Sequence, residues 1–188
     1  AVMADALSKG GDNCDLYFEH SSSISVALTD GKVNQASTHV SLGMGVRVCF
    51  GDQVGYAYSE DLSASALRAA ARTAAGIANA SQPRNVAVPL AMPTPNHYPV
   101  ASPWSDVDIS HRVKMVRSWE QAAFARDPRV QRVEASLSDA SKVVMIVRPD
   151  GRLIEDWRPM TRASVRCTAE GKGPDGEVIR ESNGYNIA

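Results

Sequence analysis

The stretch from residue 43 to residue 60 reads Gly43-Met44-Gly45-Val46-Arg47-Val48-Cys49-Phe50-Gly51-Asp52-Gln53-Val54-Gly55-Tyr56-Ala57-Tyr58-Ser59-Glu60. Apolar residues alternate with polar or small ones on both sides of Gly51-Asp52, and that pair tolerates the positive φ that a type I′ turn requires. The pattern predicts two antiparallel strands, at 45–50 and 54–58, that are joined by a hairpin.

The flanking sequence extends this prediction in both directions. Upstream, a type I′ turn at Asp30-Gly31 joins a strand at 24–29 to one at 32–37, so we expect about four strands between residues 15 and 58. Downstream, an alanine-rich run at 62–80 predicts a helix on one face of the sheet, because its apolar residues recur at helical spacing. The apolar stripe consists of Leu67, Ala70, Ala71, Ala74 and Ile77, with Arg68 and Arg72 on the other face.

The second half of the chain begins after a proline-rich segment. Six of the ten prolines fall between residues 83 and 103, which predicts an extended linker. A helix of about 18 residues follows, capped by Asp106 or Asp108 and ended by Asp127-Pro128. Its apolar positions are Ile109, Val113, Val116 and Ala123. We expect strands after it, at 130–138, 142–148, 153–157, 161–169 and 178–181, with turns at Asp150-Gly151 and Pro174-Asp175-Gly176.

These elements define an α+β fold in which antiparallel β-meanders with hairpin turns pack against two main helices in two layers. We expect a sheet-and-helix half at 1–80, a linker at 81–107 and a helix-and-sheet half at 108–188, together forming one domain. Aligning the Asp-Gly turns places Arg47-Val48-Cys49 near Val165-Arg166-Cys167. This likeness fits an internal duplication, and it fits chance similarity between hairpins equally well.

The composition excludes two classes of partner and indicates a compartment. Twenty basic and 21 acidic side chains give a net charge of −1 without runs of like charge, so neither nucleic acid nor an anionic membrane is expected as a partner. Three widely spaced cysteines indicate reduced thiols, and no segment resembles a signal peptide or a membrane span, so we predict a cytoplasmic protein. The chain does not start with methionine and residues 182–188 do not resemble a natural end, so we expect both ends to be cut.

No histidine has the spacing of a catalytic zinc site. Such a site needs two imidazoles on one helical face beside a carboxylate, whereas the four histidines are predicted at a strand end, in a strand, in a loop and in a helix. We expect a surface or hydrogen-bonded role for each of His20, His39, His97 and His111. Glu19 and His20 are neighbours on a strand, so their side chains should point to opposite faces rather than form an acid-base pair.

The remaining candidates also have structural explanations. Cys49 and Cys167 are predicted as small core residues of strands, and Cys14 has no activating cation beside it. Gly43-x-Gly45 lacks a third glycine and leads into a strand, so a bulge or close strand crossing is expected rather than a phosphate loop. The aromatic residues are predicted to be core or interface anchors; they are Trp104, Trp119, Trp157, Tyr56 and Tyr58. We therefore assign no catalytic, cofactor-binding or metal-binding residue.

Several short motifs, in order and spacing, resemble the amino-terminal portion of the TldD/PmbA family of metallopeptidases. They are Gly10-Gly11-Asp12, Asp15-Leu16-Tyr17-Phe18, Asp30-Gly31, Gly45-Val46-Arg47, Gly55-Tyr56-Ala57-Tyr58, Asp127-Pro128-Arg129-Val130, Ala135-Ser136-Leu137 and Asp150-Gly151. The resemblance implies soluble peptidases that act on unfolded peptides, pair with a subunit of the same family, mature a microcin precursor and were once called modulators of DNA gyrase. It also implies a zinc-binding His-Glu-x-x-x-His helix in the carboxy-terminal half, which has no counterpart in residues 1–188.

Two functions from different classes follow from this resemblance. In the first, the chain is a non-catalytic domain of a TldD-like zinc peptidase, which shapes the peptide chamber and forms a homo- or heterodimer interface. A sheet edge there pairs with an extended peptide through main-chain hydrogen bonds. In the alternative, the chain is a stand-alone interaction or dimerisation module without catalysis. Whether the chain belongs to an enzyme is left open by these residues.

Overall fold

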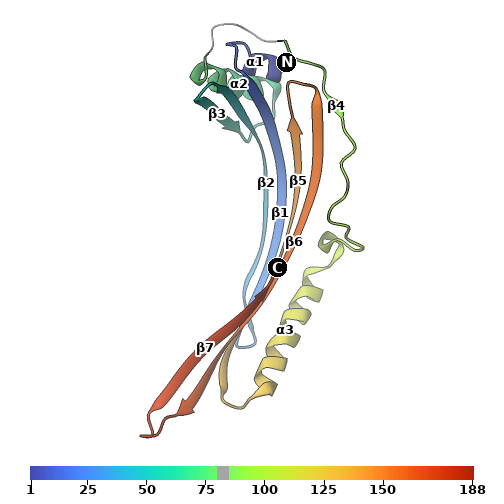
Figure 1. Cartoon of the computed structure of the whole chain (residues 1–188). Coiled ribbons are helices and arrows are strands. Elements are labelled where there is room, and N and C mark those ends of the chain that lie inside the picture. The colour runs from blue at the N-terminus through green and yellow to red at the C-terminus, as the bar shows by residue number, and fades with distance from the viewer. Residues whose placement is uncertain (80–84) are drawn as a thin grey trace. The chain divides into compact units, whose positions relative to one another are not determined.

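The computed structural model describes residues 1–79 and 85–188 and confirms the α+β fold class (Figure 1). In this part of the chain, three helices, a short 3-10 helix and a seven-stranded sheet follow one another. They are α1 (Val2–Ala6), β1 (Asn13–Thr29), β2 (Lys32–Phe50), β3 (Gln53–Ser59), α2 (Ala64–Ile77), β4 (Leu90–Ala91), η1 (Trp104–Asp106), α3 (Ile109–Arg126), β5 (Val130–Val147), β6 (Arg152–Lys172) and β7 (Val178–Ile187). The strand order is β3-β2-β1-β5-β6-β4, and β7 also pairs with β6.

The strands are longer and fewer than predicted. The residues from 13 to 59 form three strands instead of about four, because β1 and β2 continue through the polar segments that the sequence suggested as breaks. Likewise, the predicted pairs 130–138 with 142–148 and 153–157 with 161–169 are single strands, β5 and β6. Serine and threonine do not end a strand whose backbone hydrogen bonds are satisfied by neighbours on both sides.

The predicted turns join the expected strands, with one difference in turn type. Asp30 and Gly31 both have positive φ, as a type I′ turn requires. Gly51 has positive φ and Asp52 does not, which fits a type II′ turn instead of the predicted type I′. In the loop before β6, the Gly151 N–H donates to the Arg148 carbonyl at 3.1 Å, closing a turn around Pro149-Asp150.

Both long helices lie where the sequence predicted them. α2 begins after Ser63, whose side chain accepts a hydrogen bond from the Ala66 N–H, and α3 begins after Asp108, whose carboxylate accepts one from the Ser110 N–H. The predicted end of the first helix at residue 80 and the predicted start of the linker at residue 81 lie outside the described residues. α1 was not predicted, since a helix of five residues carries too little periodicity to be detected.

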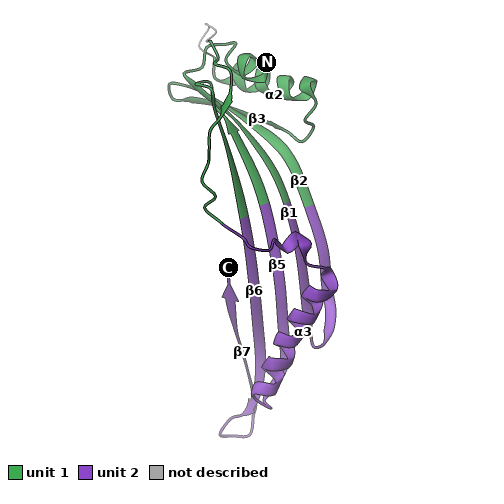
Figure 2. Cartoon of the chain, turned by 90° about the vertical axis from the view of Figure 1, so that its right-hand side faces the viewer, with its two compact units in different colours: residues 1–21, 40–98, 142–158 green, residues 22–39, 99–141, 159–188 purple. Residues whose placement is uncertain are grey.

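The chain divides into two compact units (Figure 2). Unit 1 consists of residues 1–21, 40–98 and 142–158. In it, α1 and α2 pack on the sheet face that carries Cys14 and Leu16 of β1 and Met44, Val46 and Val48 of β2. The alanines that face this core are Ala70, Ala71 and Ala74 of α2 and Ala78, which caps its C-terminal end. Ile77, predicted in that stripe, is exposed because the buried stripe ends on Ala78.

Unit 2 consists of residues 22–39, 99–141 and 159–188. α3 packs on a face that carries Val26, Leu28, Ala135 and Leu137. Its buried side chains are Arg112, Val116 and Glu120, at i, i+4 and i+8. Predicted Val116 is in this set, whereas predicted Ile109 is exposed.

The two charged side chains on the buried face of α3 hold other segments of unit 2. The Arg112 guanidinium donates to Asp139 and to the Trp104 and Val107 carbonyls, and it lies 5.4 Å from the centre of the Trp104 ring. The Glu120 carboxylate accepts a hydrogen bond of 2.6 Å from the Gly31 N–H. Buried charges require such partners, so α3 is tied both to the β1–β2 turn and to η1. The division into halves 1–80 and 108–188 and the internal duplication stay predictions.

Candidate functional site

The four histidines do not form a metal site in the described part of the chain. His20 lies inside β1 rather than at a strand end, His39 lies in β2, His97 follows β4, and His111 lies in α3; all four are exposed. No group of three or more His, Cys, Asp or Glu side chains is close enough to hold a metal ion among residues 1–79 and 85–188. The donor set that these residues offer therefore does not fit the zinc ion that the family resemblance implies.

The carboxylate of Glu19 is engaged by neighbours other than His20. It accepts a hydrogen bond of 2.7 Å from the Tyr17 hydroxyl and lies 3.1 Å from the Lys142 ammonium. The Tyr17 hydrogen bond, together with Lys142, lowers the pKa of Glu19. Glu19 is thus held ionised within a local network.

All three cysteines are free, but the two that were predicted as core residues are the less buried ones. Cys14 is 1% exposed, and burial raises the pKa of its thiol to about 12. Cys49 and Cys167 are half-buried. Cys49 alternates with the core residues of β2 and therefore points to the opposite face of the sheet.

The glycine pair of β2 and the aromatic residues have structural roles that the sequence only partly indicated. A side chain at Gly45 would lie 2.7 Å from the Tyr56 hydroxyl, so this glycine makes room for the Tyr56 ring. Trp104 and Trp119 pack against the core of unit 2, as predicted. Tyr56 and Tyr58, at 59% and 72% exposure, are not core residues, because they alternate with the β3 residues that face α2.

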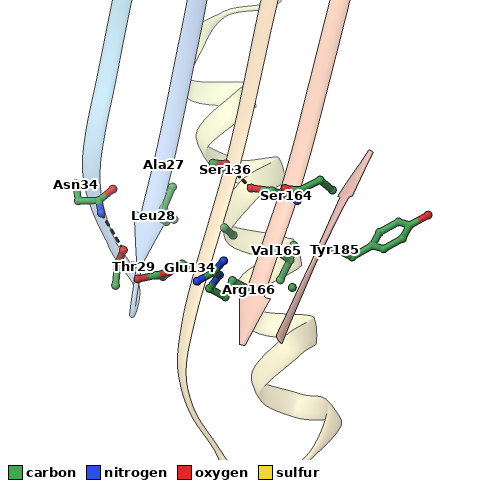
Figure 3. Close-up of a pocket in the computed structure, with 13 residues that line it drawn as sticks. Ala27, Leu28, Thr29, Asn34, Glu134, Ser136, Ser164, Val165, Arg166 and Tyr185 are labelled. Atoms are coloured by element: carbon green, nitrogen blue, oxygen red, sulfur yellow. Dashed lines mark hydrogen bonds between the residues drawn. The ribbon is translucent and has the colours of Figure 1, made fainter. Parts of the chain in front are cut away.

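Unit 2 contains a surface depression, shown in Figure 3. It has a volume of about 330 Å³ and is bordered by residues from five strands. Ser136 of β5 and Ser164 of β6 share a hydrogen bond of 2.7 Å across its floor, and Asn34 donates to Thr29 at 2.8 Å. Ser136 and Ser164 alternate with Ala135 and Val165, which pack toward α3, so the depression lies on the opposite face of the sheet.

A second depression of about 570 Å³ adjoins the first, because Glu134 and Arg166 border both. We call the two together the unit 2 groove. Arg132 pairs with Glu134 at 2.8 Å, and Arg180 of β7 pairs with Glu170 of β6 at 2.5 Å. The walls of the unit 2 groove are thus polar, with acidic and basic side chains nearly balanced. Such a surface favours polar contacts with a ligand over burial of apolar groups.

β7 forms the outer border of the groove and has a free edge. Within the described residues it pairs with β6 alone, in an unbroken antiparallel register from Lys172↔Val178 to Ala163↔Ile187. The Gly173 N–H donates to the Glu177 carbonyl at 2.9 Å. Since bonding alternates along an antiparallel pair, the odd-numbered residues of β7 bond to β6. The even-numbered residues therefore direct N–H and C=O groups away from β6; they are Val178, Arg180, Ser182, Gly184 and Asn186.

One hydrogen bond supports this assignment of the free edge. The Gly184 N–H donates to the side-chain oxygen of Asn183 at 2.8 Å rather than to β6. The outward main-chain groups of Ser182 and Asn186 are the ones an added strand would meet. Sequence reasoning missed these residues, although the polar alternation of 164–170 was a signal that could have identified the open face.

Among the described residues, no helix combines the length and the hydropathy needed to span a lipid bilayer.

Two family models match the chain. The model described as PmbA/TldA metallopeptidase domain 1 matches residues 14–78, and the one described as PmbA/TldA metallopeptidase central domain matches residues 102–187. Together they cover most of the chain.

Curated relatives carry the same family name. A "Metalloprotease TldD homolog" of Haemophilus influenzae is 33% identical over 165 residues, which is 86% of this chain and 34% of that protein. A "Metalloprotease TldD homolog" of Buchnera aphidicola subsp. Schizaphis graminum is 26% identical over 173 residues, or 92% of this chain and 36% of that protein. The chain thus spans about a third of the length of these relatives.

Solved structures share the fold at low sequence identity. A modulator of DNA gyrase from Bacteroides thetaiotaomicron superposes with a TM-score of 0.75 at 17% identity, covering 98% of this chain and 42% of that one. TldE from Thermococcus kodakarensis superposes with a TM-score of 0.62 at 15% identity, covering 99% and 43%. The two matching domain models and the TldD relatives show that the chain belongs to the PmbA/TldD metallopeptidase family and comprises its first and central domains.

Proposed function

We propose that this chain is a non-catalytic portion of a cytoplasmic TldD-like metallopeptidase, and that it holds extended polypeptide and contacts a partner subunit of the same family. The relatives' name, metalloprotease, supports hydrolysis of peptides by the whole protein. In this proposal the zinc ion and its ligands belong to other residues, because the donors present here do not fit a metal. The free thiols agree with a reducing compartment.

The observation that carries the proposal is the free edge of β7 beside the unit 2 groove. An extended chain that adds to this edge would form main-chain hydrogen bonds with Ser182 and Asn186. Such bonds are formed by any sequence except proline, so they suit a surface that takes many peptides. Side chains of the added strand that point to the open face would lie over the polar groove walls.

A pair of variants at Ser182 tests this edge. Ser182→Pro removes an outward N–H but no hydrogen bond to β6, and proline is tolerated at such an edge position. Ser182→Ala is the matched control, since it loses the hydroxyl contact to Thr168, 2.7 Å away, and keeps the N–H. One main-chain hydrogen bond contributes about 1 kcal/mol, so Ser182→Pro should weaken binding of an extended ten-residue peptide about five-fold relative to Ser182→Ala.

Hydrogen exchange provides the second readout. Peptide binding should slow exchange of the Ser182 and Asn186 amides, and the chain with added zinc should hydrolyse no peptide. Equal affinity of the two variants, with protection confined to other strands, would refute the edge as the peptide site.

The same experiment separates the alternative of a stand-alone interaction module. In that case the wild-type chain would sediment as a dimer or bind a partner chain through β7, Ser182→Pro would weaken that association, and added peptide would protect no amide.

A further inference from the structure

Unit 1 contains a separate depression of about 570 Å³ that the proposed function does not use. Its residues alternate with the core residues of β1, β2, β5 and β6, so it lies on the face opposite α1 and α2. Three of its residues are charged: Asp15 of β1, Arg47 of β2 and Arg148 beside the end of β5.

The two arginines differ in whether an acidic side chain pairs with them. Arg47 donates to one oxygen of Asp15 through Nη2 at 2.6 Å and through Nε at 2.9 Å. Asp15 is the acidic residue among those that line the depression. The Arg148 guanidinium forms no hydrogen bond or ion pair with another side chain in the described part of the chain. One positive charge of this surface is therefore left for a ligand.

The position of Arg148 is set by the backbone of the β5–β6 hairpin. Its N–H donates to the Arg152 carbonyl at 2.9 Å, and its carbonyl accepts from the Gly151 N–H at 3.1 Å. Arg152, on the other side of the same turn, is paired with Asp150 at 3.3 Å. Only one of these two neighbouring cations is thus available.

Apolar and aromatic side chains complete the depression. Ile146 and Ile154 are half-buried and line it together with Tyr56. The Tyr56 ring lies over Gly45, where any side chain would collide with it, and Tyr56 pairs with Arg47 in the β2–β3 register. A ligand that meets Arg148 therefore also meets apolar surface.

We infer that this depression binds the terminal carboxylate of a peptide whose last side chain is apolar, with Arg148 as the binding cation. A guanidinium offers a planar pair of donors that matches the two oxygens of a carboxylate. The apolar side chain would lie against Ile146, Ile154 and Tyr56. The inference relies on the proposed function only in taking a peptide as the ligand; the site is in a different unit from β7.

Calorimetric titration of the chain with two probes tests the inference. The probes are an acetylated pentapeptide ending in leucine, as the free acid and as the amide. The wild-type chain should bind the acid at least ten-fold more tightly than the amide. Arg148→Met should abolish this preference, and Arg148→Lys should keep part of it because the ammonium lacks the planar pair of donors. Arg152→Met, the matched control, should keep the preference.

Several results would overturn the inference. Equal binding of acid and amide by the wild-type chain would exclude a carboxylate site, and equal losses in Arg148→Met and Arg152→Met would indicate a general charge effect. Displacement of the peptide by inorganic phosphate at the same concentration would indicate an unselective anion site. Ser182→Pro should leave the preference for the acid unchanged, so failure of the β7 proposal and failure of this one are distinguishable.

Discussion

Replacing Gly55 with alanine would place a methyl group where β3 and α2 are in closest contact. The Cβ would lie 2.0 Å from the Ala74 carbonyl oxygen, 2.9 Å from its carbon and 3.1 Å from the Ala78 nitrogen. These are backbone atoms of a helix, so no side-chain rotation relieves the collision. To restore an ordinary contact of about 3.4 Å, α2 would have to move by roughly 1.4 Å.

The cost follows from what this movement disrupts. The face of α2 consists of alanines that pack directly on β2 and β3, and separating them opens gaps too small for water. Overpacking typically lowers the free energy of unfolding by about 1–3 kcal/mol. Because this collision involves backbone atoms, its cost should be at or above the upper limit of that range. We therefore expect Gly55→Ala to lower the free energy of unfolding by about 3 kcal/mol or more.

Gly76→Ala is the matched control, because no atom lies within 4 Å of its added methyl group. It should stabilise α2 by about 0.5–1 kcal/mol, as Gly→Ala does inside a helix. Urea unfolding followed by circular dichroism measures both changes. A Gly55→Ala chain within about 0.5 kcal/mol of the wild type would refute the reasoning, since packing errors of that size are ordinary surface effects.

Three further predictions concern buried polar groups. Arg112→Ala leaves Asp139, which is 8% exposed, without its partner, so the free energy of unfolding in urea should fall by about 3–5 kcal/mol. Arg132→Ala removes an exposed ion pair and should change the urea midpoint little. Equal effects of the two variants would show that the buried Arg112 pair contributes no more than an exposed one. Cys14 should resist iodoacetamide until the chain unfolds, whereas rapid native-state alkylation would contradict its burial. Because folding raises the pKa of Cys14 from 9.0 to about 12, the unfolded chain loses this proton first, so stability should fall as pH rises from about 9 to 12, and Cys14→Ala should lack that part of the pH dependence.

Local sequence signals were enough to predict the turns and the two long helices. The Asp30-Gly31 turn depends on backbone conformations that few residues adopt, and α2 and α3 begin at side chains that bond to their own first turns. Each signal involves residues a few positions apart, so the chain determines it without knowledge of the rest of the fold. The family resemblance likewise came from short motifs in order, and the two domain models confirmed it.

The tertiary structure decided the rest, because it depends on what each residue meets from distant parts of the chain. β1 and β2 continue through polar segments since neighbouring strands satisfy their backbones, and Arg112 and Glu120 are buried since Asp139 and Gly31 supply partners for them. Ser182 is a candidate binding residue because its N–H lies on a free strand edge. Arg148 is a candidate because no acidic side chain among the described residues pairs with its guanidinium. A sequence lists donors and charges, but only pairing across the sheet determines which of them are left for a ligand.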